Sequence, residues 1–64
     1  MRENLRQARK DKGLTQKQVA EFLGITERAY QNLEYGLTLG SIKHWDVLED
    51  LFGCPQRKLR EILE

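Results

Sequence analysis

Apolar residues along this chain recur every three or four positions, within short segments that glycine residues separate. Leu5 and Ala8 show this spacing near the start, and Trp45, Leu48 and Phe52 show it later. Such spacing places side chains on one face of an α-helix. We find no sustained alternation of apolar and polar residues of the kind that marks a β-strand. The pattern therefore predicts an all-α protein built of short amphipathic helices.

Residue types that begin and end helices divide the chain into five predicted helices. Ser and Thr favour the N-cap position, because their hydroxyl accepts a backbone N–H that the helix leaves free. Thr15 forms such a capping box with Gln18, and glycine suits the residue after a helix because it adopts the left-handed conformation. The predicted helices are residues 2–12, a second from the cap at 15 to the glycine at 24, a third over about 26–35, and a fourth from the cap at 41 to the glycine at 53. A fifth follows, with Pro55 in its first turn and apolar positions at Leu59, Ile62 and Leu63.

Each predicted helix carries apolar side chains on the face expected to turn inward. The single cysteine, Cys54, is interpreted as a small buried hydrophobe. In the first four helices and their turns the inward positions are Leu5, Ala8, Val19, Ala20, Leu23, Ile25, Tyr30, Leu33, Ile42, Trp45, Leu48, Leu51 and Phe52.

Residues 16–35 are the most informative part of the sequence, because two short helices there flank Gly24. Gly24 is placed to turn the chain sharply, and Ile25 is placed to fill the turn from the core side. Tyr30 and Leu33 anchor the second helix, which leaves its other face outward. This pattern is typical of a helix-turn-helix, whose second helix lies in a DNA major groove.

The segment GLTQKQVAEFLGITERAYQNLEYG, residues 13–36, resembles the helix-turn-helix of the Cro/C1-type, or XRE-type, transcriptional regulators. The matches include Gly-Leu-Thr-Gln at 13–16, Leu-Gly-Ile-Thr at 23–26, and Leu-Glu with a glycine two positions further on at 33–36. The resemblance extends from Leu5 to Leu63. It implies a compact five-helix bundle of the lambda-repressor-like DNA-binding type, forming one domain over residues 1–64.

This resemblance also implies roles for individual residues. The family's arginine in its first helix corresponds to Arg9, so we expect an Arg9–Glu34 ion pair. Arg28 is suited to guanine O6 and N7, and Asn32 to adenine N6 and N7. The positions that contact bases fall on Glu27, Arg28, Ala29 and Asn32, and the candidates for phosphate contact are Gln16, Lys17, Thr26, Gln31, Tyr35 and Lys43.

Four positions depart from the family pattern. Tyr30 replaces a usual Ile or Val, so its ring either packs inward or points its hydroxyl outward. Leu37 stands where Lys or Arg often touches a phosphate, and Gly40 stands where Pro is common. Glu49 occupies a position that is usually small and apolar. The change at Leu37 weakens the expected phosphate contact without altering the predicted fold.

Charge and composition limit the alternatives. The chain has 64 residues and a formal net charge of +1, so overall charge does not itself indicate nucleic acid. The first twelve residues carry +3, and they either face phosphates or form a solvated helix face. One Cys and one His are too few for a disulfide framework or a structural zinc site, which favours a reducing, cytoplasmic setting. No apolar run is long enough to span a bilayer.

The preferred interpretation is a sequence-specific regulator of double-stranded DNA, a repressor of phage or mobile-element type. A chain of this length leaves no room for an effector domain, so regulation is expected to act by occupying a site. We expect a homodimer on a palindromic operator, formed in solution or only on DNA. The candidate dimer contacts are Leu59, Ile62 and Leu63 or, alternatively, Leu37 and Leu39.

The alternative is an antitoxin or another protein-binding module that uses the same fold. The near-neutral charge and the Leu-Thr-Leu segment at 37–39 favour it. An enzyme is not supported, because Ser41 is explained as an N-cap and His44 lacks an acid–base partner. The sequence predicts no cofactor, metal or small-molecule ligand.

Overall fold

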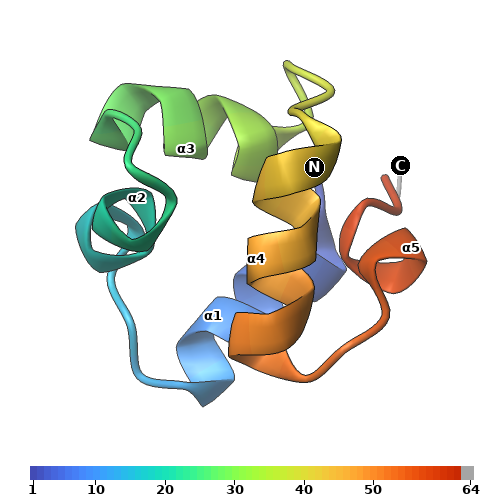
Figure 1. The fold of residues 1–64 in the computed structure, drawn as a ribbon. Helices are drawn as coiled ribbons and strands as arrows, with labels where there is room; N and C mark the ends of the chain where they lie inside the picture. Colours follow the sequence, from blue (N-terminus) through green and yellow to red (C-terminus); the bar gives the residue numbers. More distant parts are fainter. Residues whose placement is uncertain (63–64) are drawn as a thin grey trace.

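The computed structural model describes residues 1–62, and these form helices without any strand (Figure 1). The helices are α1 (Glu3–Asp11), α2 (Gln16–Leu23), α3 (Glu27–Tyr35), α4 (Ile42–Phe52) and α5 (Gln56–Leu59). The predicted all-α fold with a helix-turn-helix at its second and third helices is confirmed.

Side-chain caps fix where three of these helices begin. The Thr15 hydroxyl accepts from the Gln18 amide at 3.1 Å, and the Gln18 side chain accepts from the Thr15 amide at 2.8 Å. Thr26 caps α3 and Ser41 caps α4 in the same way. Gly24 has φ +69°, the left-handed conformation that ends α2 and turns the chain into α3. The predicted capping residues and the sharp turn are therefore confirmed.

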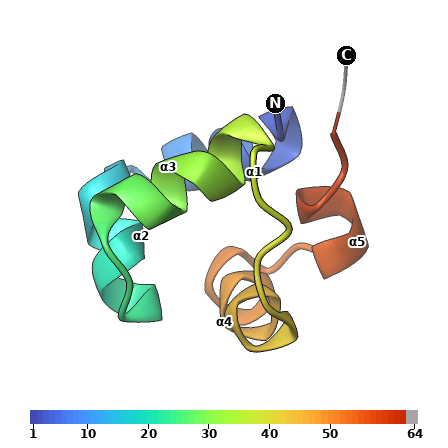
Figure 2. The ribbon, with the colours of Figure 1, turned by 90° about the horizontal axis from the view of Figure 1, so that it is seen from above.

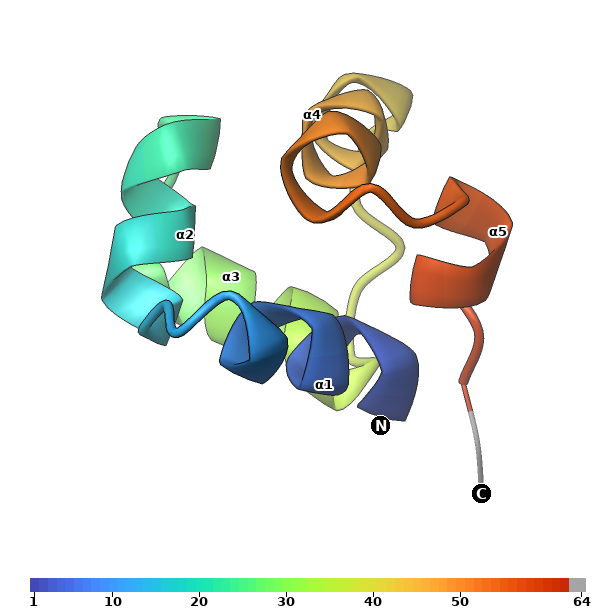
Figure 3. The same ribbon diagram turned by 90° about the horizontal axis from the view of Figure 1, so that it is seen from below.

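The helices enclose one core. α1 packs against α3 and α5, α2 packs against α3, and α4 packs against α5. Figures 2 and 3 show α4 and α5 across the core from α1 and α3. The fully buried apolar side chains include at least one from every helix: Leu5, Val19, Ala20, Tyr30, Leu33, Trp45, Leu48 and Leu59.

Several predictions about apolar positions are wrong. Ile42, the first residue of α4, is 73% exposed and is not part of the core cluster. The fifth helix ends at Leu59, so Ile62 follows it as non-helical chain. Leu59 is fully buried inside its own chain and cannot serve as a dimer contact. Cys54 packs against the core but is only half-buried. The predicted apolar position Leu63 lies outside the described residues.

The loop between α3 and α4 explains why glycine replaces the family's usual proline at position 40. Gly40 has φ +73°, a conformation closed to proline, whose ring holds φ near −65°. A Cβ at Gly40 would lie 2.6 Å from Leu33 Cδ2 and 3.0 Å from Trp45 Nε1. The Trp45 indole donates to the Leu39 carbonyl at 2.9 Å. The loop therefore packs closely over the core tryptophan, and only glycine fits that approach.

Candidate nucleic-acid interface

The outer face of α3 carries polar side chains in a row along the helix. Glu27 and Arg28 are exposed in its first turn, while Gln31 and Asn32 are half-buried one turn further on. Tyr35 is exposed in the last turn. On the helical wheel Arg28, Asn32 and Tyr35 lie opposite the buried Tyr30 and Leu33, whereas Glu27 and Gln31 lie toward the edge of that outer face. Apart from Ala29, the predicted base-contacting and phosphate-contacting residues of α3 therefore lie on its outer face.

Ala29, the remaining predicted base contact, lies on the edge of this face. It lines a small hollow together with Ile25, Thr38, Ser41 and His44. Residues of α3 and of the start of α4 therefore line the same hollow on one side of the molecule. In Figure 1, α3 runs along the upper edge, and the loop into α4 rises beside it.

Two predicted phosphate contacts lie in the first turns of other helices. Lys17 is exposed in the first turn of α2, and Lys43 is exposed in the first turn of α4. First-turn amides lack intrahelical acceptors, and the positive end of the helix dipole favours an anion there. Thr26, at the start of α3, is exposed, and its oxygen accepts from the Ala29 amide at 3.1 Å, so its own proton remains a donor.

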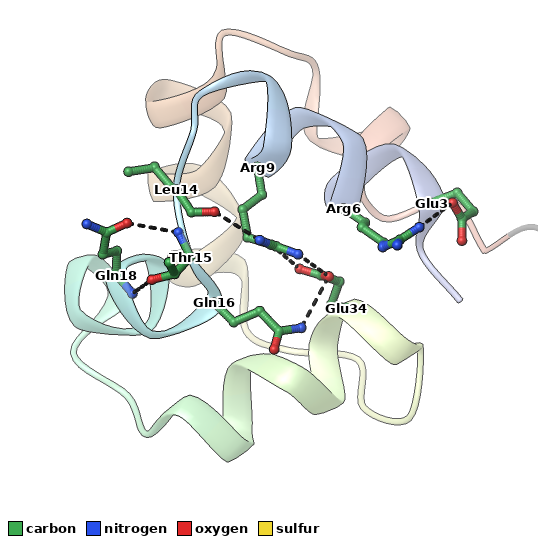
Figure 4. A network of polar contacts seen from close by, with 8 residues as sticks. All are labelled: Glu3, Arg6, Arg9, Leu14, Thr15, Gln16, Gln18 and Glu34. Carbon is green, nitrogen blue, oxygen red and sulfur yellow. Dashed lines mark hydrogen bonds and ion pairs between the residues drawn. The ribbon is translucent and has the colours of Figure 1, made fainter.

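Gln16 has a different position from the other phosphate candidates. Its side chain is half-buried and donates to Glu34 Oε1 at 3.3 Å (Figure 4). The amide therefore links the first residue of α2 to the last turn of α3. Its main contact in the structure is internal, and what remains for an anion is the backbone at the start of α2 and the second amide proton.

The expected Arg9–Glu34 ion pair is confirmed. Arg9 Nε donates to Glu34 Oε2 at 2.9 Å and Nη2 donates to Oε1 at 3.0 Å, which is bidentate geometry. Arg9 Nη1 also donates to the Leu14 carbonyl at 2.9 Å. As Figure 4 shows, Glu34 is the point where α1, the start of α2 and α3 meet. The pair therefore fixes the angle at which the helix-turn-helix is held.

Burial and hydrogen bonding act in opposite directions on this pair. Glu34 is only 1% exposed, and burial alone would raise its pKa. Hydrogen bonds and charge from Arg9 outweigh that effect and lower the pKa of Glu34 below its usual value. Hydrogen bonding to Glu34 in turn raises the pKa of Arg9. The ionised pair is thus the stable form at neutral pH.

Tyr30 resolves the alternative that the sequence left open. Its ring packs inward with no exposed surface, and its hydroxyl is buried without a hydrogen-bond partner of good geometry among the described residues. Burial, and then the nearby Glu34 carboxylate, raise the pKa of Tyr30. The ring therefore takes the core position of an Ile or Val, and the hydroxyl stays neutral.

Arg2 is a structural residue that the sequence pattern did not indicate, and its side chain is only 2% exposed. It donates to the carbonyls of Leu33 at 2.6 Å, Thr38 at 2.8 Å and Arg60 at 3.0 Å. Its guanidinium carbon also lies 5.1 Å from the ring centroid of Trp45. Burial, and then the charge of Arg60, lower the pKa of Arg2. Arg2 thus joins the end of α3, the α3–α4 loop and the C-terminal segment.

These contacts correct the interpretation of the basic first segment. Arg2 is buried, Arg9 is paired with Glu34, and Arg6 lies 3.7 Å from Glu3 on the surface. Residues 1–12 hold five basic groups, and two of these are therefore structural and cannot face phosphates. Lys10 and Lys12 remain exposed at the end of α1. Among the predicted DNA contacts, the exposed basic side chains are Lys17, Arg28 and Lys43.

No described helix is long and apolar enough to cross a membrane. Within residues 1–62, no three His, Cys, Asp or Glu side chains are grouped so that they could hold a metal ion.

Comparison with known families agrees with this geometry. A family model described as helix-turn-helix matches residues 5–60. The chain therefore belongs to the Cro/C1-type (XRE-type) helix-turn-helix family. It is accordingly a DNA-binding helix-turn-helix regulator whose partner is double-stranded DNA. No curated protein and no solved structure matches the chain.

Proposed function

We propose that the protein is a sequence-specific repressor of phage or mobile-element type that binds a palindromic operator as a homodimer. α3 enters the major groove, and the starts of α2 and α4 bind the flanking phosphates. Occupation of the operator blocks transcription. The observation that supports this proposal best is the free polar face of α3, held rigidly by the buried Arg9–Glu34 pair.

Base contact is assigned to four residues of α3. Arg28 pairs with guanine, Asn32 pairs with adenine, Glu27 accepts from a cytosine amine, and Ala29 lies against the base edges beside them. Phosphate contact is assigned to Gln16, Lys17, Thr26, Gln31, Tyr35 and Lys43. The exposed Lys17 and Lys43 provide charge for this contact, and the first-turn amides of α2 provide donors.

The first test is selection of bound duplexes from a random DNA pool, followed by titration of the selected duplex at two salt concentrations. The proposal predicts an enriched palindrome and a steep loss of affinity with salt, because neutralised phosphates release counterions. Half-sites are expected about 34 Å apart, one helical turn. Absence of enrichment, with binding that ignores salt, would contradict the proposal and favour a protein partner.

Single substitutions separate base contact from phosphate contact. Arg28→Ala and Asn32→Ala should each weaken binding to the selected site by about 1–3 kcal/mol and relax base choice at one position. Lys17→Ala should weaken binding to all sequences equally and reduce the salt dependence. Lys10→Ala, an exposed lysine on α1, is the matched control and should change neither property. Unchanged base preference in Arg28→Ala would contradict the assignment of that residue.

A further inference from the structure

The hollow beside Ala29 is an apolar feature within a largely polar surface. It has a volume of about 210 Å³ and lies between α3 and the start of α4. Its lining is almost entirely apolar, and Ile25, Ala29 and Leu33 form the side that belongs to the helix-turn-helix. A polar group placed in such a hollow would lose its hydrogen bonds to water and gain few in return. The hollow is therefore suited to an apolar group.

This hollow is continuous with the surface assigned to DNA. Ala29, on its α3 side, is a predicted base contact. Ser41 and His44 line it from the start of α4, and they flank Lys43 along the chain, an exposed candidate for phosphate contact. A duplex whose bases meet Ala29 and whose phosphates meet Lys43 must therefore pass over the hollow.

The walls of the hollow are held in place by contacts with the core. Leu33 is only 3% exposed, and Ile25 packs against the core cluster. The backbone of Gly40 approaches so closely that a Cβ there would lie 2.6 Å from Leu33 Cδ2. Thr38 borders the hollow, and its carbonyl is already bonded to Arg2 at 2.8 Å. The hollow is thus formed in advance, so a group that enters it pays little to order its walls.

Duplex DNA offers one base substituent that fits such a site. In the major groove the bases present mainly hydrogen-bond donors and acceptors, and thymine alone adds a methyl group at C5. A methyl group is similar in size to a water molecule, about 30 Å³, so the hollow has room for it and for the adjoining carbon edge of the ring. We infer that the hollow receives the C5 methyl group of a thymine, an assignment that rests on the proposed function.

The position of this thymine in the site follows from the spacing along α3. Ala29 and Asn32 lie three residues apart, so their side chains are neighbours on the helix surface. Three residues advance about 4.5 Å along a helix, and successive base pairs lie about 3.4 Å apart. The thymine is therefore expected next to the base pair that Asn32 reads. Ala29 determines this specificity by being small, because a larger side chain there would fill the hollow.

Replacement of single thymines by uracil in the selected duplex tests the assignment directly. Uracil lacks the C5 methyl group and keeps every hydrogen-bonding group of thymine. At the thymine next to the position where Asn32→Ala relaxes base choice, uracil should weaken binding about fourfold, the effect expected for one buried CH₂-sized group. Thymines outside the segment that α3 covers are the internal control and should tolerate uracil without loss of affinity.

A substitution in the protein gives the second half of the test. Ala29→Leu fills the hollow, so this variant should bind the thymine and uracil duplexes equally. The matched control is Phe22→Leu, on α2 and 60% exposed in wild type, which should retain the fourfold difference. Circular dichroism verifies that both variants fold. Because the readout is a ratio of two affinities of one protein, a partly unfolded preparation does not change it.

The outcomes separate this inference from the proposed function. It is overturned if no thymine stands beside the Asn32 position, if uracil there has no effect, or if the fourfold difference persists in Ala29→Leu. Each of these results would leave the proposed function intact, provided that the random pool yields a duplex whose binding falls steeply with salt. Failure to select any duplex would instead overturn both.

Discussion

Two arginines hold the C-terminal end of α3, and they do so by different chemistry. Arg9 pairs with the Glu34 carboxylate through two hydrogen bonds and links α3 to α1. Arg2 is more completely enclosed, but it is held by backbone carbonyls and the Trp45 ring, and no carboxylate of residues 1–62 forms an ion pair with it. The Arg9–Glu34 pair fixes the position of the helix-turn-helix, and the contacts of Arg2 fix the position of the α3–α4 loop beside it.

The two arginines differ in the kind of buried group that loses its partner when the arginine is removed. Removal of Arg9 leaves a buried negative charge without compensation, which is among the most costly changes that a small domain can suffer. Removal of Arg2 leaves neutral carbonyl groups without donors, and each of these costs less. The comparison therefore predicts a clear order of effects, even though both side chains are large, charged and mostly enclosed.

The largest effect is expected for Arg9→Met. This substitution keeps the aliphatic stem but leaves the buried Glu34 carboxyl without its cation, and breaking such a pair costs about 3–5 kcal/mol. Urea unfolding measures the change. The matched control is Arg6→Met, which breaks the exposed contact with Glu3 and should cost less than about 1 kcal/mol. If the two variants lost equal stability, the Arg9–Glu34 pair would have no special role.

Acid titration tests the same pair without removing Arg9. The pKa of Glu34 is lowered on folding, so its contribution to stability is complete above the pKa of the unfolded carboxyl, about 4.3. That contribution is lost as pH falls through the lowered value in the folded state. Glu34→Gln should therefore be less stable than wild type at neutral pH, and the difference should narrow below about pH 4. A constant difference across this range would contradict the assignment.

These two arginines also show how far sequence reasoning reaches. The Arg9–Glu34 pair was predictable because both partners are specific residue types at positions that match a family motif. Arg2 bonds to carbonyl groups, which every residue possesses, so its partners leave no mark in the sequence. The exposure of Ile42 and the burial of Leu59 were not predicted from the sequence, for a related reason. Helical periodicity identifies an apolar face but does not show which turns of that face the core reaches.

The intermediate effect is expected for Arg2→Met. The carbonyls of Leu33, Thr38 and Arg60 would lose a shared donor, at a cost of about 1–3 kcal/mol. Because two of these groups lie at the end of α3 and in the α3–α4 loop, amide exchange should accelerate around residues 37–40. Arg2→Lys should recover only part of the loss, since an ammonium group lacks the planar fork of a guanidinium. Full recovery by lysine would show that charge alone matters at this position.

The smallest effect is expected for Tyr30→Phe, which removes a hydroxyl that lies next to the Arg9–Glu34 pair but lacks a hydrogen-bond partner of good geometry. Deleting an unsatisfied buried polar group should leave stability within about 1 kcal/mol of wild type, or raise it.

The dependence of stability on pH above neutrality should change more clearly in Tyr30→Phe. Folding raises the pKa of Tyr30, so the wild-type contribution is complete below the unfolded value, about 10, and is lost as pH rises further. Tyr30→Phe should therefore lose less stability than wild type above about pH 10, as followed by urea unfolding across that range. A marked loss of stability at neutral pH would instead show that the hydroxyl takes part in the ion-pair network. The Arg9 site would then contain a further hydrogen-bond donor, the Tyr30 hydroxyl, that the Arg2 site lacks.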